Sequence, residues 1–232
     1  MPPAPSREHT NRAYDGELSR LHDLLEVMGR RVEEMIQGSV RALVERDTRA
    51  AEEIRAFDKG IDQLELEIDQ LCNQILACRQ PVASDLRYIT TALKVVTDLE
   101  RIGDVSVNIC ERVVELNAEP ALAPHVDVAN MAREVQQMLH EALEAFANAD
   151  VDRARDVIER DGSIDAYYAQ IFRVLLTYMM EDPRNIFRAQ RLQSVAKYLE
   201  RIGDHVTNLG EMVVFMVKGQ DIRHGGHGTL TK

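Results

Sequence analysis

The spacing of apolar residues along the chain predicts long amphipathic helices. Between Leu18 and Leu43, apolar residues recur three or four positions apart, which places them on one face of a helix expected over 12–46. A second helix is predicted to run from an Asp47 N-cap to about Cys78, and Pro81 follows it. No segment shows the polar and apolar alternation that is typical of a β-strand.

The same pattern continues through the rest of the chain. A third helix is predicted from an N-cap at Ser84 or Asp85 to about Asn117, and two prolines mark a linker at 119–124. An Asp150 N-cap and Pro183 bound the fifth helix. The helices expected in the second half cover about 128–146, 151–182 and 185–218.

The fold predicted from this pattern is all-α, with two tandem, related three-helix bundles built from six long antiparallel helices. The first bundle is expected at 12–118 and the second at 125–218. Residues 1–11, which include three prolines, are predicted to be a disordered lead-in. Residues 219–232 are predicted to be a flexible tail, in which His224 and His227 form no organised metal site.

One six-residue sequence, Leu-Glu-Arg-Ile-Gly-Asp, occurs at 99–104 and again at 199–204. Each copy is followed by an Asn four residues after its Asp and by a Glu three residues later. Residues separated by four lie on one face of a helix, so each half is expected to carry a column of oxygen-bearing side chains. The columns are Glu100, Asp104, Asn108 and Glu111 in the first half, and Glu200, Asp204, Asn208 and Glu211 in the second.

The preceding helix of each half carries a further pair of aspartates with the same spacing. These pairs are Asp58 with Asp62 and Asp161 with Asp165. Antiparallel packing is expected to bring them beside the columns. Repulsion between like charges favours a bound cation, and oxygen ligands suit hard metal ions. Because the chain has 39 acidic residues, a structural salt-bridge network is the alternative to a metal site.

Three further features surround the repeated sequence. Leu86, Ile89 and Leu93 are predicted to lie on the outward side with Glu100 and to bind a partner. Gly103 and Gly203 are interpreted as allowing close approach by a neighbouring helix or a ligand shell. His205 is interpreted as a packed or hydrogen-bonded residue, with a metal ligand as the alternative.

Charge and cysteine content indicate which partners and which cellular location to expect for the protein. A net charge of −11 and a pI of about 5.1 argue against nucleic-acid binding and favour cations or basic protein surfaces as partners. Three cysteines without metal-ligand spacing suggest reduced thiols. The sequence shows neither a secretory signal nor an apolar run of about 18 residues, so a cytoplasmic location is expected.

The specific motifs resemble those of the PhoU family of phosphate-transport regulatory proteins. The matching residues are Gln-Pro-Val-Ala-Ser-Asp-Leu-Arg at 80–87, the doubled six-residue sequence with its following Asn, and Asp204 with His205. The resemblance covers roughly 14–222 and implies two related three-helix bundles. It also implies metal binding by Glu100, Asp104, Glu200 and Asp204, and then by the four aspartates Asp58, Asp62, Asp161 and Asp165. Oxygen ligands leave Fe, Zn, Mn, Mg and Ca open.

The resemblance further implies a negative regulator of the phosphate regulon. Such a protein links the ATPase of the phosphate ABC transporter to a sensor histidine kinase, at the periphery of their membrane complex, and often forms a homodimer. A carboxylate-bridged metalloenzyme is one alternative, although no histidine has the Glu-x-x-His spacing of di-iron bundles. A structural bundle that binds nothing specific is another alternative. No Walker-type phosphate loop is present.

Overall fold

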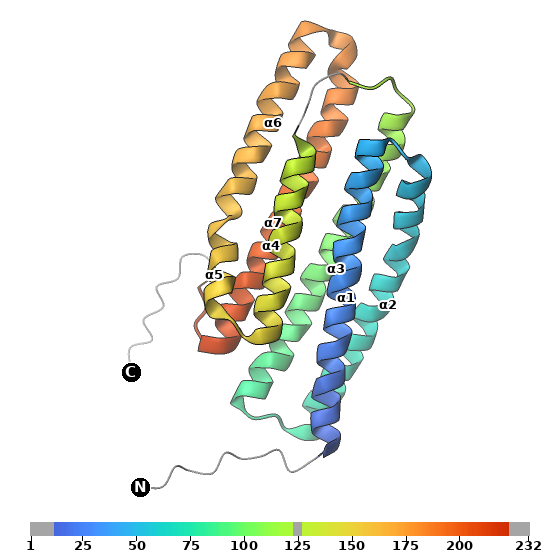
Figure 1. Cartoon of the computed structure of the whole chain (residues 1–232). Helices are drawn as coiled ribbons and strands as arrows, with labels where there is room; N and C mark the ends of the chain where they lie inside the picture. Colours follow the sequence, from blue (N-terminus) through green and yellow to red (C-terminus); the bar gives the residue numbers. More distant parts are fainter. Residues whose placement is uncertain (1–11, 123–126, 223–232) are drawn as a thin grey trace.

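The computed structural model describes residues 12–122 and 127–222, and within these ranges the chain forms helices and no strands (Figure 1). The predicted all-α fold of two related three-helix bundles is confirmed. The predictions for 1–11, for 123–124 of the linker and for 223–232, including His224 and His227, lie outside the described residues. The elements are α1 (Arg12–Glu45), α2 (Thr48–Arg79), α3 (Ala83–Asn117), α4 (Val128–Asn148), α5 (Val151–Glu159), α6 (Asp161–Glu181), the 3-10 turn η1 (Pro183–Asn185) and α7 (Ile186–Lys218).

Two of the predicted N-caps are confirmed. Asp47 accepts a hydrogen bond of 3.0 Å from the backbone N–H of Ala50 at the start of α2. Asp150 likewise accepts bonds from the first free N–H groups of α5. The N-cap predicted for α3 is wrong, because the helix begins at Ala83 and has no side-chain cap. Asp85 instead accepts a 2.8 Å hydrogen bond from the Tyr14 hydroxyl of α1.

The predicted fifth helix is divided into α5 and α6 at Arg160. The backbone tightens there, because the N–H of Arg160 bonds to Val157 O at 3.2 Å and the N–H of Ser163 bonds to Arg160 O at 2.9 Å. Asp161, Gly162 and Ser163 are weak helix formers, which is why the helix breaks at this position. The break places Asp161 in the first turn of α6, where free N–H groups favour negative charge.

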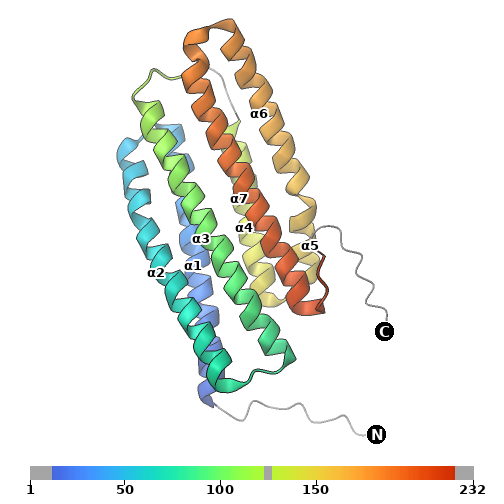
Figure 2. The ribbon, with the colours of Figure 1, turned by 180° about the vertical axis from the view of Figure 1, so that it is seen from behind.

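Helices α1–α3 form the first bundle and α4–α7 form the second, and the two bundles pack against each other. The most extensive contact joins α3 to α7, which lie side by side in Figures 1 and 2, and α1 also packs on α4. Arg87 Nε donates to Met216 O at 3.0 Å, and the rings of Tyr88 and Phe146 stack at 5.5 Å. The buried apolar residues of both halves therefore form one hydrophobic core.

None of the helices in the described ranges combines the length and apolar character needed to cross a membrane.

Candidate functional site: two acidic helix faces

The first acidic face comprises Asp58, Asp62 and Glu65 on α2 with Glu100 and Asp104 on α3. Antiparallel packing of the two helices brings these carboxylates close enough that neighbouring negative charges raise the pKa of Asp58, Glu65 and Glu100. Glu65 was not identified from the sequence as a residue of this site. Its position three residues after Asp62 continues the same helical stripe and is the signal that identifies it.

Partial burial is the main electrostatic feature of the first acidic face. Loss of solvation is the largest effect raising the pKa of Asp58, Glu65 and Glu100, and neighbouring carboxylates raise these pKa values further. Arg101 acts in the opposite direction on Glu65 and Glu100. Its guanidinium lies 3.4 Å from a Glu100 oxygen and 3.6 Å from an Asp104 oxygen. The face therefore keeps a strong negative charge with one nearby arginine.

The second acidic face comprises Asp161 and Asp165 on α6 with Glu200 and Asp204 on α7. The pKa of Asp204 is raised first by loss of solvation and then by Glu200 and Asp161. Lys197 opposes this rise, and its Nζ lies 2.5 Å from both oxygens of Glu200. The repeated sequence thus forms two acidic faces with different neighbours.

The second face also differs from the first at Asp161 and at the position equivalent to Glu65. The Thr207 hydroxyl donates a 3.0 Å hydrogen bond to Asp161. Tyr168 lies 103 positions after Glu65, the same interval that separates Asp58 from Asp161, and its ring lies 5.5 Å from Lys197 Nζ. An aromatic ring and an ammonium group therefore occupy the region where the first face has a fifth carboxylate.

The last two residues of each predicted column have surroundings that differ from those of the carboxylates in the repeated sequence. The Glu111 carboxylate lies 3.7 Å from Arg55 and 3.3 Å from Arg112, so two arginines balance its charge. Asn108 and Asn208 are half-buried one turn after the aspartates of the repeated sequence, and Glu211 is half-buried on α7. The carboxylates with raised pKa values belong to the two acidic faces and are Asp58, Glu65, Glu100 and Asp204.

The oxygen donors of both faces fit hard metal ions by their chemistry. Among the described residues, however, neither face brings three possible ligand atoms within 4.8 Å of one another. Arg101 contacts Glu100 and Asp104, and Lys197 contacts Glu200, so both faces already hold a positive charge. A metal ion would therefore have to draw the carboxylates away from these two side chains.

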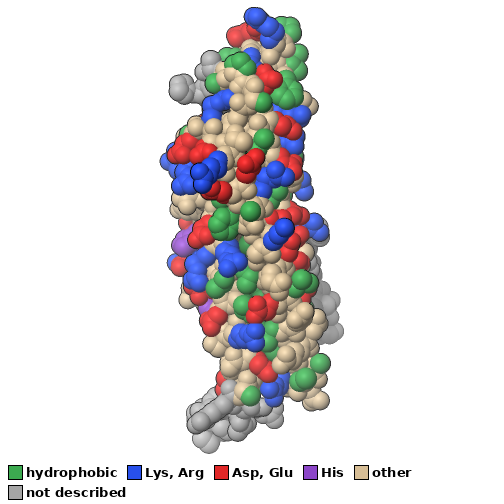
Figure 3. All heavy atoms as spheres, turned by 90° about the vertical axis from the view of Figure 1, so that its right-hand side faces the viewer, with side chains coloured by type: hydrophobic (Ala, Val, Ile, Leu, Met, Phe, Trp, Pro, Cys, Tyr) green, Lys and Arg blue, Asp and Glu red, His purple; other side chains and the backbone are tan. Residues whose placement is uncertain are grey.

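The structure contradicts the outward placement predicted for Ile89, and partner binding at Leu86 and Leu93 stays a prediction. Ile89 is fully buried and Leu93 is half-buried against the core, so only Leu86 is exposed. The prediction treated the first bundle alone, whereas α3 is covered by α1, α2 and α7. Exposed apolar side chains gather instead near the turn between α6 and α7, and Figure 3 shows hydrophobic and basic groups at this upper end. This apolar end comprises Met180, Ile186 and Phe187 around the turn, and continues along α6 to Leu176 and Phe172.

His205, Gly103 and Gly203 all lie close to side chains of a neighbouring helix. His205 Nδ1 lies 2.8 Å from Asp98 on α3, so it makes a polar contact between the bundles. A methyl group added to Gly103 would meet Ile61 at 3.6 Å, an ordinary contact, whereas one at Gly203 would meet Ile164 at 3.3 Å. A neighbouring helix does approach each glycine, but a methyl group would fit at Gly103 and would be only slightly tight at Gly203.

Comparison with known proteins agrees with the duplicated architecture. The PhoU domain model matches the chain twice, over 25–113 and 128–213. A relative from Pseudomonas putida, named phosphate-specific transport system accessory protein PhoU homolog, is 42% identical over 96% of this chain and 88% of its own length. The Escherichia coli K12 protein PhoU, with the corresponding accessory-protein name, is 36% identical over 97% of this chain and 93% of its own.

Solved structures show the same fold. The crystal structure of PhoU from Pseudomonas aeruginosa has a TM-score of 0.86 and 41% sequence identity, covering 89% of this chain and all of that one. PhoU from Streptococcus pneumoniae, described as a phosphate transport system regulatory protein, has a TM-score of 0.83 and 29% identity over 90% of this chain and 98% of its own. The doubled domain match and the full-length relatives show that this chain belongs to the PhoU family.

Proposed function

We propose that the protein is a cytoplasmic negative regulator of the phosphate regulon, acting as an adaptor between the phosphate ABC transporter and its sensor histidine kinase. The names of its relatives, which describe an accessory protein of phosphate-specific transport, support this role. These names describe no catalytic activity, and we propose that the chain is not an enzyme. Its partners would be the transporter ATPase and the kinase.

The observation that carries the metal part of the proposal is the accumulation of carboxylates, some of them partly buried, on two helix pairs. Burial and mutual repulsion raise the pKa of Asp58, Glu65 and Glu100 in the first face and of Asp204 in the second. A divalent or trivalent ion would supply positive charge that relieves this repulsion. Glu100 and Asp104 would then hold α3 to α2, and Glu200 and Asp204 would hold α7 to α6.

The apolar end supports contact with a protein partner. Met180 is 78% exposed, and Ile186 and Phe187 lie just after the tight turn that follows α6. Exposed apolar side chains gathered at one end of a molecule favour a protein interface. We propose that this end serves the adaptor function, and that the protein also forms a homodimer.

Binding measurements with both partners test the adaptor proposal. The full chain would be immobilised and titrated with the purified cytoplasmic part of the kinase and with the transporter ATPase, at low and high phosphate. Saturable binding to both is expected, and Met180→Asp/Phe187→Ser should weaken it. Val82→Ser, in the exposed turn between α2 and α3 at the opposite end of the molecule (Figure 1), is the matched control. Absence of binding to either partner at every phosphate level would contradict the adaptor role.

A further inference from the structure

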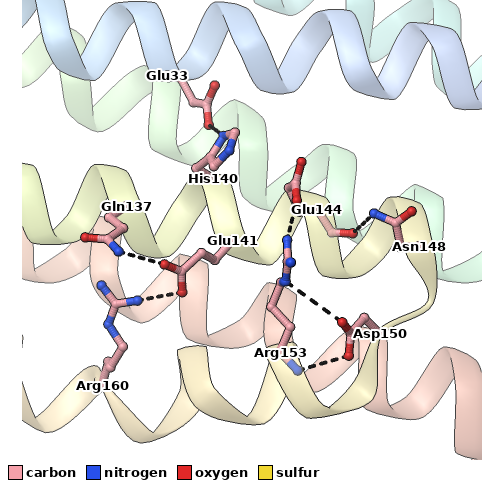
Figure 4. Close-up of polar contacts among 9 residues, drawn as sticks. All are labelled: Glu33, Gln137, His140, Glu141, Glu144, Asn148, Asp150, Arg153 and Arg160. Atoms are coloured by element: carbon pink, nitrogen blue, oxygen red, sulfur yellow. Dashed lines mark hydrogen bonds and ion pairs between the residues drawn. The ribbon is translucent and has the colours of Figure 1, made fainter.

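A cleft lies between α1 and α4, where the two bundles meet. Its volume is about 400 Å³, and its apolar lining includes Leu25, Val95 and Leu143. Glu33 on α1 and His140 on α4 meet across it at 3.1 Å, as Figure 4 shows. His22 and Glu26 also line the cleft, so two side chains one helical turn apart on α1 reach the same hollow.

His22, Asp23 and Glu26 form a group with metal-ligand chemistry. One ring nitrogen and two carboxylate oxygens from these residues all lie within 4.8 Å of one another. The Nδ1 of His22 lies 3.9 Å from an oxygen of Asp23. His140 and His205 each pair with a single carboxylate, so His22 differs from them in having two acidic neighbours among the described residues.

The surrounding charges also favour a cation at this group. In the part of the chain that the structure describes, no Lys or Arg forms an ion pair with Asp23, and the carboxylate of Glu26 pairs with Arg30. Arg30 lies one turn beyond Glu26 on the same helix and lines the same cleft. One carboxylate is therefore available, and the second is held by an exposed arginine that a metal ion can displace.

We propose that His22, Asp23 and Glu26 bind one zinc-like divalent transition-metal ion at the lip of the α1–α4 cleft. Mixed imidazole and carboxylate ligands suit Zn²⁺ better than Mg²⁺ or Ca²⁺, which prefer oxygen alone. The three side chains leave a coordination position for water from the cleft. This site is separate from both acidic faces, which lie on α2–α3 and α6–α7 and contain no histidine ligand.

Zinc titration of the full chain tests the proposal. The parent protein for all variants would be Cys78→Ser, because Cys78 is an exposed free cysteine and thiolates are zinc ligands. His22→Ala should weaken one equivalent of Zn²⁺ binding by at least about tenfold, as expected for loss of a direct ligand. His140→Ala removes a histidine from the same cleft and should leave Zn²⁺ affinity unchanged.

Two further variants separate metal binding from a purely structural role. Glu26→Gln should weaken Zn²⁺ binding, whereas Arg30→Gln should strengthen it by removing the competing cation. Electron paramagnetic resonance of bound Cu²⁺ should lose a nitrogen coupling in His22→Ala and retain it in His140→Ala. Equal Zn²⁺ affinity and identical Cu²⁺ spectra in the parent and His22→Ala would overturn the proposal.

The acidic faces are controlled independently in the same titration. Glu100→Gln/Asp104→Asn/Glu200→Gln/Asp204→Asn should retain the Zn²⁺ equivalent that depends on His22. If this variant lost the Zn²⁺ equivalent that depends on His22, the assignment of that ion to α1 would be overturned. This outcome is independent of whether the proposed adaptor function holds.

Discussion

The two acidic faces share an identical six-residue sequence and differ in what surrounds it. The first has five carboxylates, and Arg101 lies more than 3 Å from its nearest acidic oxygens. The second has four carboxylates, and Lys197 pairs closely with Glu200. Burial and repulsion raise the pKa of three acidic residues in the first face and of one in the second. Glu65 and Lys197 lie outside the repeated sequence, whereas Arg101 lies within it, so flanking residues account for part of the charge difference between the two faces.

Matched neutralisation of the two faces should produce the largest effect on metal binding. Glu100→Gln/Asp104→Asn is expected to weaken the tighter class of Mn²⁺ sites by about 100-fold, because ligand loss has costs at least of this order. Glu200→Gln/Asp204→Asn should affect a weaker class, because Lys197 already balances part of that charge. Calorimetric titration of both variants measures this difference. Equal losses from a single class of sites would show that the faces are equivalent.

Removing the basic residue of each face should affect metal-free stability unequally. Lys197→Gln leaves the largely buried Glu200 without its ion partner and should lower the free energy of unfolding by about 1 kcal/mol. Arg101→Gln removes longer contacts from a side chain that is 57% exposed, so a change below about 0.5 kcal/mol is expected. Urea unfolding with a chelator present compares the variants. A larger loss of unfolding free energy in Arg101→Gln than in Lys197→Gln would contradict this prediction.

The glycines of the repeated sequence should respond differently to alanine. Gly103→Ala is expected to stabilise the protein by about 0.5–1 kcal/mol, because the added methyl makes an ordinary contact and alanine favours the helix. Gly203→Ala should give little gain, because Ile164 must move slightly to accept the methyl. Thermal unfolding of the two single variants provides the measurement. Equal stabilisation of the two variants would contradict the proposed difference in packing around Gly103 and Gly203.

The smallest expected effect concerns pH. Because the pKa of Glu100 is raised in the folded protein, the folded state binds more protons than the unfolded state between about pH 4.3 and that raised pKa. The resulting stabilisation is complete below this interval and is lost as the pH rises through it. Metal-free Glu100→Gln should therefore exceed the parent in stability by a few tenths of a kcal/mol at pH 7 and lose this advantage at low pH. Parallel urea curves at both pH values test this sign.

Local sequence signals predicted the helices and much of the acidic faces. The Asp47 and Asp150 caps depend on short-range hydrogen bonds, and the doubled carboxylate spacing depends on helical periodicity. Burial of Ile89 could not be read from the first bundle alone, because α7 covers α3 only in the assembled fold. The positions of Arg101 and Lys197 likewise depend on how each helix pair packs and turns its side chains.

Metal content provides the most direct test of the claim that the duplicated acidic faces are cation sites. The full chain carrying His22→Ala would be reconstituted with Mn²⁺, Zn²⁺ or Fe²⁺ in turn, dialysed, and measured by elemental mass spectrometry. The matched protein would add Glu100→Gln/Asp104→Asn/Glu200→Gln/Asp204→Asn, with helical content checked by circular dichroism. Stoichiometric metal in the first protein and its loss in the second are predicted. Absence of bound metal from the first, or equal metal in both folded proteins, would contradict the claim.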